Sequence, residues 1–434
     1  MALLLVALGI CWPRAAGAGE FRFVLEGEAG VRNDGNYGRR LTGLDDEQGT
    51  LDRDQSVGRA GLNLRFSYAL QRLNLALDYS PSYERSLKDS NLSGTTHRLD
   101  FGVAGDLTRR LRMDIRERLL STPNLDLYAP AAVAETTTVA PRGDQLSHTL
   151  DVAFTQSFSR RSSLLLGATH SLRKFEDEEL FDSEALNARI GAGFDLERGR
   201  RIEAAAGVGR YDYQERGDAD VRTVGLAWVM NGRSNHLRLE GGAFWAESTD
   251  RRILVLPGEP GLPGETRTVL LQESDQGWRG GVQFSQERQL LRWALGLTHD
   301  ISPGSGVGRA VEADNAFLGL SVPIGREWEL GLDGSGSRQN DLSSSQDALE
   351  LGDGREDLTE FATGTARAAW TFAPAFRLEG GYSRVWQRSR VASFGDLNYA
   401  RYFLSLAVRL YSSGETPKAP DSLGRPTDEE PDDQ

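Results

Sequence analysis

The feature that most constrains the fold of this chain is a two-residue alternation of apolar and polar side chains, which recurs from residue 20 to residue 411. In the first such segment Phe21 and Phe23 alternate with Arg22 and Glu26. Successive side chains of a β-strand point to opposite faces of the sheet, so this period predicts strands with one apolar and one polar face. The pattern returns often enough to predict about 18 strands (16 to 20), and we find no convincing helix.

The connections between the predicted strands alternate between two kinds. Eight are tight turns of a few residues, and the one at Asn231 and Gly232 carries the Asn-Gly pair that favours hairpins. The others are long polar stretches, such as Arg32–Ser56, Ser121–Ser147, Glu247–Asp275 and Gln339–Thr359. An opening strand, eight hairpins and a closing strand give the count of 18. Both ends of the predicted sheet then lie on the tight-turn side.

Composition excludes several other classes of protein. Acidic residues number 63 and basic residues 50, giving a net charge of −13, which argues against a nucleic-acid binder. After the N-terminus no stretch of about 18 apolar residues could form a membrane-spanning helix. Cysteine occurs once, at Cys11, so a disulfide scaffold is excluded. An all-β protein whose alternation dilutes its hydrophobicity fits these limits.

The two ends of the chain differ from the repeating region. Ala2–Trp12 is apolar and is followed by small residues up to Ala18, which predicts a secretory signal peptide over residues 1–18. The repeating region then occupies residues 19–411. Residues 412–434 are rich in acidic side chains, and we expect a disordered tail that either is simply solvated or binds a periplasmic partner.

Taken together, the even strand count and the two-sided connections resemble the bacterial outer-membrane β-barrel class, porins in particular, and more weakly the barrels of exopolysaccharide export. Outward aromatic residues beside the tight turns, such as Phe66 and Trp228, strengthen the resemblance. It implies an all-β, single, antiparallel up-and-down barrel in the outer membrane of a Gram-negative cell. Outer-membrane lipid, lipopolysaccharide and the barrel assembly machinery would be its partners. A soluble β-sandwich or propeller is the alternative.

If the apolar residues face lipid, alternation assigns arginines and carboxylates of both signs to the lumen. The candidate lumen and substrate-contact residues are Arg65, Asp78, Arg98, Asp100, Arg112, Asp114, Arg116 and Arg118. Arginine presents a planar fork to carboxylate or phosphate, so this group could bind anions. The alternative is that these residues form cross-strand ion pairs that fill and rigidify the wall.

The long connection Ser121–Ser147 contains apolar and threonine-rich sequence. In a porin-like barrel such a loop could fold inward as a constriction, with Tyr128, Thr136, Thr137 and Thr138 as candidates; an ordinary surface loop is the alternative. The apolar runs Arg252–Leu256 and Thr266–Leu271 flank prolines and predict a protruding hairpin.

The sequence favours a channel that passes small solutes or an anionic polymer. A non-conducting structural or receptor barrel of an envelope or exopolysaccharide secretion assembly is the alternative, and a barrel-rim hydrolase is a third. The five histidines are scattered without metal-ligand spacing, and no phosphate-binding loop occurs. We therefore expect no enzyme activity, no cofactor and no metal site.

Overall fold

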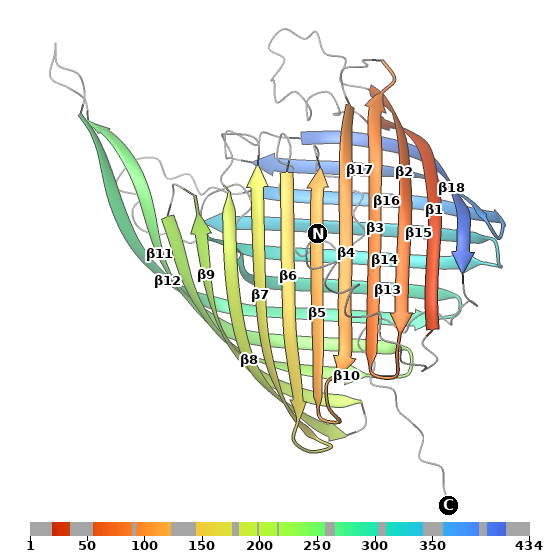
Figure 1. Ribbon diagram of the computed structural model, residues 1–434. Coiled ribbons are helices and arrows are strands. Elements are labelled where there is room, and N and C mark those ends of the chain that lie inside the picture. Colours follow the sequence, from red (N-terminus) through yellow and green to blue (C-terminus); the bar gives the residue numbers. More distant parts are fainter. Residues whose placement is uncertain are drawn as a thin grey trace, which may run out of the picture.

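The computed structural model describes residues 20–34, 55–88, 93–122, 145–175, 182–197, 199–214, 217–256, 265–302, 310–341, 359–389 and 397–413. These residues form 18 β-strands (Figure 1). The strands are β1 (Glu20–Asp34), β2 (Gln55–Ala69), β3 (Leu73–Ser86), β4 (Ser93–Asp106), β5 (Leu111–Thr122), β6 (Gln145–Ser157), β7 (Ser162–Phe175), β8 (Ser183–Glu197), β9 (Arg200–Tyr213), β10 (Gly217–Asn231), β11 (Asn235–Leu256), β12 (Glu265–Arg288), β13 (Leu291–Ser302), β14 (Val311–Ile324), β15 (Trp328–Asp341), β16 (Thr359–Ala373), β17 (Phe376–Ser389) and β18 (Leu397–Ser413).

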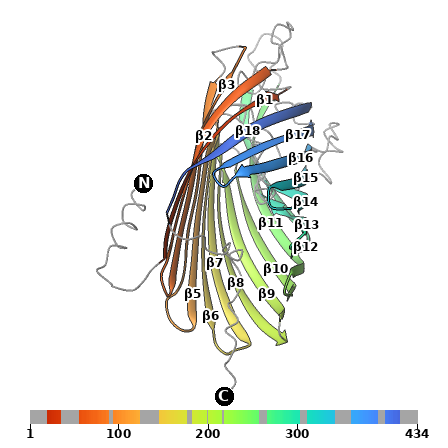
Figure 2. The ribbon, with the colours of Figure 1, turned by 90° about the vertical axis from the view of Figure 1, so that its right-hand side faces the viewer.

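Each strand pairs antiparallel with the strands before and after it in the chain, and β18 pairs with β1. The sheet is therefore closed, and the predicted 18-stranded barrel is confirmed. Its strands curve so that β3–β8 and β13–β17 form opposite walls (Figures 1 and 2). Among the described residues there is no helix long and apolar enough to cross a membrane.

Tight turns join the strands in the eight predicted places. Leu70 N donates to Leu73 O (2.8 Å) between β2 and β3, and Gly232 N donates to Asn235 O (2.7 Å) between β10 and β11. Gly199, between β8 and β9, has a φ of 80°, which side chains rarely adopt, and its carbonyl accepts a hydrogen bond from Asn231 N at 2.6 Å. Glycine is needed there because a Cβ atom would collide with the Asn231 carbonyl oxygen.

The register fixes which side chains share a face, because directly opposite residues of paired strands point the same way. Arg65 lies opposite Val24 on one side and Asp78 on the other, so all three face the interior. Leu226 and Trp278 face outward and are each 63% exposed. Large apolar side chains thus cover the outside of the barrel, as the alternation predicts.

The predicted protruding hairpin is confirmed. Pairing between β11 and β12 continues from Asn235 opposite Gln286 to Leu256 opposite Glu265, and the two strands rise beyond their neighbours (Figure 1). The closing strand is longer than the alternation indicates, since β18 ends at Ser413 rather than at residue 411. The proposed signal segment 1–18, the tail beyond residue 413, Tyr128, Thr136, Thr137 and Thr138 lie outside the described residues.

Candidate functional site: the lumen

In the half of the lumen nearest the tight turns, ionic side chains form networks that cross several strands. One network spans the seam where the first and last strands meet. Glu26 of β1 lies 3.4 Å from Arg409 of β18 and 3.3 Å from Arg65 of β2, measured between side-chain oxygen and nitrogen. Arg65 also contacts Asp78 of β3 at 3.3 Å. Four adjacent strands are thereby linked by alternating charges.

A second network lies beside the first on β15, β16 and β17. Arg367 contacts Asp333 at 3.3 Å and Glu379 at 3.7 Å. Arg377 contacts Glu379 at 3.3 Å and Glu329 at 3.4 Å. Each arginine therefore has two carboxylates, which is possible because a guanidinium presents five N–H donors.

A third network occupies the opposite part of the wall, on β8, β9 and β11. Arg201 contacts Asp195 at 3.6 Å and Glu203 at 3.0 Å. Arg238 reaches across the intervening strand β10 to Glu203 at 2.8 Å and also contacts Glu240 at 3.0 Å. It can do so because the inward residues of β10 at this level include Ala227 and Val229, which are short and are buried.

All eight candidate lumen residues predicted from the sequence lie on the inner face. Most of them are paired: Arg98 with Asp100 (2.8 Å), Arg116 with Asp114 (3.0 Å) and Arg118 with Asp151 (3.3 Å). Arg112 is exposed to the lumen, and within the described part of the chain it forms no ion pair. The structure shows the ion-paired arrangement that was the alternative at these positions, and contact with a solute stays a prediction.

A cavity of about 500 Å³ lies against the inner wall at the seam. Its lining includes five arginines and three glutamates: Arg32, Arg59, Arg65, Arg377, Arg409, Glu26, Glu28 and Glu379. Of these residues, only Arg65 is among the contact residues predicted from the sequence. The cavity depends on β18 meeting β1, so pairing the two ends of the repeat was the signal that could have found it.

The half of the lumen nearest the long connections is different, because its inward side chains are closed off from solvent. Phe244, Val57 and Val385 all face inward and are 0% exposed. Arg32 of β1 donates two hydrogen bonds to Glu84 of β3, at 2.8 and 2.7 Å, and both side chains are buried.

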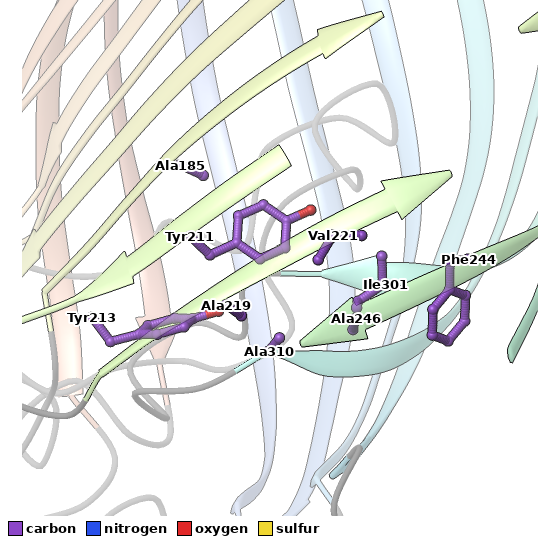
Figure 3. Close-up of a cluster of buried hydrophobic side chains, with 9 residues drawn as sticks. All are labelled: Ala185, Tyr211, Tyr213, Ala219, Val221, Phe244, Ala246, Ile301 and Ala310. Atoms are coloured by element: carbon purple, nitrogen blue, oxygen red, sulfur yellow. The ribbon is translucent and has the colours of Figure 1, made fainter. Parts of the chain in front are cut away.

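Apolar and aromatic side chains on the inner wall of this half form a buried cluster (Figure 3). Tyr211 and Tyr213 of β9 lie in it with Val221 of β10 and Phe244 of β11. A smaller cluster joins Phe361, Val385 and Tyr399 on β16, β17 and β18. Tyr213, Phe361 and Tyr399 thus add aromatic rings to the inner wall of this half.

A closed barrel with an even number of strands therefore carries apolar side chains outside and ionic side chains inside. The chain has the fold of an outer-membrane β-barrel. No family model matches the sequence, and no curated protein matches it. In the described part of the chain, no group of three or more histidine, cysteine or acidic residues is placed to hold a metal ion.

Solved structures of similar architecture include channels and receptors of the outer membrane. OccAB4 of Acinetobacter baumannii is 11% identical, with a TM-score of 0.40, over 92% of this chain and 100% of that one. Pseudomonas aeruginosa OccK2 (OpdF), solved in complex with glucuronate, is 10% identical, with a TM-score of 0.41, over 91% and 98%. The siderophore receptor PiuA of A. baumannii is 9% identical, with a TM-score of 0.43, over 91% and 82%. Identities and scores this low do not identify a solute for this barrel.

Proposed function

We propose that this protein is an outer-membrane channel that passes small hydrophilic solutes through its charge-lined lumen. The proposal rests on the difference between the outer and inner faces of the barrel wall. Large apolar side chains are exposed on the outside. Their contact with water would be energetically unfavourable, whereas their contact with lipid would not. Ionic side chains line the inside, where water can solvate them. The cell's outer membrane is the environment that suits both faces, and its lipid, lipopolysaccharide and assembly machinery would be the partners.

The seam cavity supports anionic solutes as the substrate class. Five arginines and three glutamates line it, so cationic side chains outnumber anionic ones there. Guanidinium groups bind carboxylate and phosphate with two parallel hydrogen bonds. Arg65 and Arg409 share the carboxylate of Glu26, so an anion that enters the cavity can contact either arginine without leaving Glu26 unpaired.

Ion selectivity in planar bilayers tests this proposal. Replacing Arg65, Arg377 and Arg409 together by glutamine should lower the ratio of anion to cation permeability several-fold, measured as a shift of the reversal potential in a salt gradient. The matched comparison is the triple replacement of Arg112, Arg116 and Arg118 by glutamine. These three arginines lie on β5 and were predicted from the sequence to contact the solute. Conducting channels whose selectivity responds to neither triple variant would contradict a charge-selective lumen.

A second candidate function rests on the buried side chains of the long-connection half. Phe244 and Val385 face the lumen yet are shielded from solvent, as expected of a barrel that does not conduct at rest. We propose as the alternative a structural or receptor barrel of an envelope or exopolysaccharide secretion assembly. A folded barrel, recognised by heat-modifiable mobility on a gel, that gives no conductance steps would favour this alternative.

A further inference from the structure

The strands β12 and β13 separate before either of them ends. Their pairing runs from Arg288 opposite Leu291, beside the tight turn, to Gly280 opposite His299. Beyond this point β13 pairs only with β14, and β12 continues with β11 in the protruding hairpin (Figure 1). Among the described residues, 300–302 of β13 therefore have no backbone pairing with β12. The barrel wall is open at this place.

The height of the separation lies within the membrane. Gly280 is eight residues from Arg288, and at about 3.4 Å per residue and a tilt of about 40° these residues rise roughly 21 Å. The apolar band of an outer-membrane barrel is about 25 Å tall. Unpaired strand edges are not found at that depth where lipid alone surrounds them, because lipid cannot satisfy their backbone groups. The separation must therefore contact the lumen as well as the lipid.

On the inner face an ion pair bridges the separation. A guanidinium nitrogen of Arg279 on β12 lies 2.5 Å from a carboxylate oxygen of Asp300 on β13, and the two side chains are 30% and 37% exposed. Water screens a pair with this exposure, so its members can exchange partners at small cost. Ile301 N also donates to the Asp300 carboxylate, at 2.9 Å. Asp300 thus keeps a hydrogen bond when Arg279 leaves it.

On the outer face an aromatic contact covers the same place. Trp278 of β12 stacks on His299 of β13 with ring centroids 4.0 Å apart, yet Trp278 remains 63% exposed. His299 is held from the other side, because its Nδ1 atom lies 2.7 Å from a carboxylate oxygen of Asp314 on β14. Its Nε2 atom is buried and has no hydrogen-bond partner in the described part of the chain. The closed arrangement therefore leaves one polar atom unsatisfied.

A groove of about 770 Å³ leads from this place over the outer wall. Gly241 and Gly280 lie directly opposite each other in its floor, and a Cβ atom on Gly241 would meet nothing within 4 Å. Val282 and Leu297 line it with apolar side chains, and charged residues of β14, β15 and β16 border its other side. Arg279 also borders the groove. An apolar surface and a cationic group thus meet where the strands separate.

This combination fits a molecule with an apolar chain and an anionic head. We propose that β12 and β13 form a lateral gate, through which a single-chain amphiphile with such a head moves between the lumen and the membrane. The head replaces Asp300 at the Arg279 guanidinium, which binds carboxylate or phosphate with two parallel hydrogen bonds. The alkyl chain lies in the groove against Val282 and Leu297. The gate rests on the water-filled lumen of the proposed function and adds amphiphiles to its solutes.

Cysteine labelling in proteoliposomes tests the gate. In a chain whose single cysteine, Cys11, is changed to serine, Thr298→Cys places a thiol on the inner face beside the separation. Thr365→Cys places one on the inner face of β16, where pairing is continuous. A maleimide with a phosphate head and a long alkyl chain, dissolved in the lipid, should label Thr298→Cys at least several-fold faster than Thr365→Cys. Equal rates, or no labelling at Thr298→Cys in a barrel shown to be folded by heat-modifiable mobility, would overturn the gate.

The outer aromatic contact supplies a second readout. Trp278→Ala in the Thr298→Cys chain should raise the rate of labelling by the alkyl maleimide several-fold, because it removes the ring that covers the separation. The matched control is Trp328→Ala, which removes a stack on Trp370, with ring centroids 5.4 Å apart, from a continuously paired wall. This control should leave the rate unchanged. An equal increase in both variants would indicate general loosening of the barrel and would reject the gate.

A small hydrophilic maleimide separates the gate from the proposed function. It should label both Thr298→Cys and Thr365→Cys from the water of the lumen. If it labels both sites while the alkyl maleimide labels neither, the lumen is open and the gate alone is rejected. If it labels neither site of a folded barrel, the water-filled lumen is contradicted, and the gate fails with it.

Discussion

The two halves of the lumen use ionic side chains in opposite ways. Near the tight turns, Arg65 is paired with Glu26 and Asp78 but remains 53% exposed. Near the long connections, Arg32 is paired with Glu84 and only 6% of its side chain is exposed. Water screens the first kind of pair, so it contributes little to stability and its members can exchange partners. The second kind is held in place, because both of its members are shielded from water.

This difference indicates that the two halves of the lumen have different roles. Exchangeable pairs suit a surface over which ions move, since a passing anion can replace a carboxylate without a large cost. Buried pairs and aromatic clusters suit a part of the wall that must keep its shape. Function in transport is therefore expected to depend on the tight-turn half, and stability on the long-connection half.

The largest effect on stability is expected from removing one partner of the buried pair. Glu84→Gln should lower the free energy of unfolding by roughly 3 kcal/mol, because it removes a carboxylate that pairs with the buried Arg32 guanidinium. Urea titration of the folded fraction, scored by heat-modifiable mobility, measures the loss. A change no larger than that of Asp100→Asn would show that the two halves do not differ.

A pair of phenylalanines compares the halves with the same side chain. The Phe244 ring covers Gly277 in the long-connection half, and the Phe317 ring covers Gly296 elsewhere on the inner wall. Phe244 is fully buried, whereas Phe317 is half-buried. Phe244→Ala should cost about 3 kcal/mol of unfolding free energy through the cavity it leaves, and Phe317→Ala clearly less. Equal losses in urea titration would contradict the assigned difference in burial.

The smallest expected effect concerns the exchangeable pairs. Asp100→Asn removes the partner of Arg98, whose side chain is 37% exposed, and should change the unfolding free energy by less than about 1 kcal/mol. Screening should reduce even this effect when the urea titration is repeated in high salt. A loss above 2 kcal/mol that persists in high salt would mean that this pair behaves like the buried one.

Much of the fold could be read from the alternation. The hairpins were placed correctly because each joins strands that are neighbours in sequence, as between Leu70 and Leu73. The assignment of Arg98 and Arg116 to the lumen followed from the two-residue period alone. The seam cavity could not be derived in this way, because Arg409 and Glu26 are 383 residues apart and meet only when the sheet closes.

The burial of individual lumen side chains could not be predicted from the sequence either. Alternation places Phe244 and Phe317 on the same face, but it cannot tell that one is sealed from solvent and the other only partly covered. Likewise Arg65 and Arg32 have the same side chain and the same inward direction. Their different exposure arises from what surrounds them in space, which no local pattern records.

The sequence by itself determined the strand period, the strand count, the two kinds of connection and the inward or outward direction of each side chain, because these follow from the chemistry of residues close together in the chain. The tertiary structure alone decided which charges meet across the seam and which half of the lumen is shielded. Those properties depend on closure of the sheet, which brings distant strands together and fixes how much water each side chain meets.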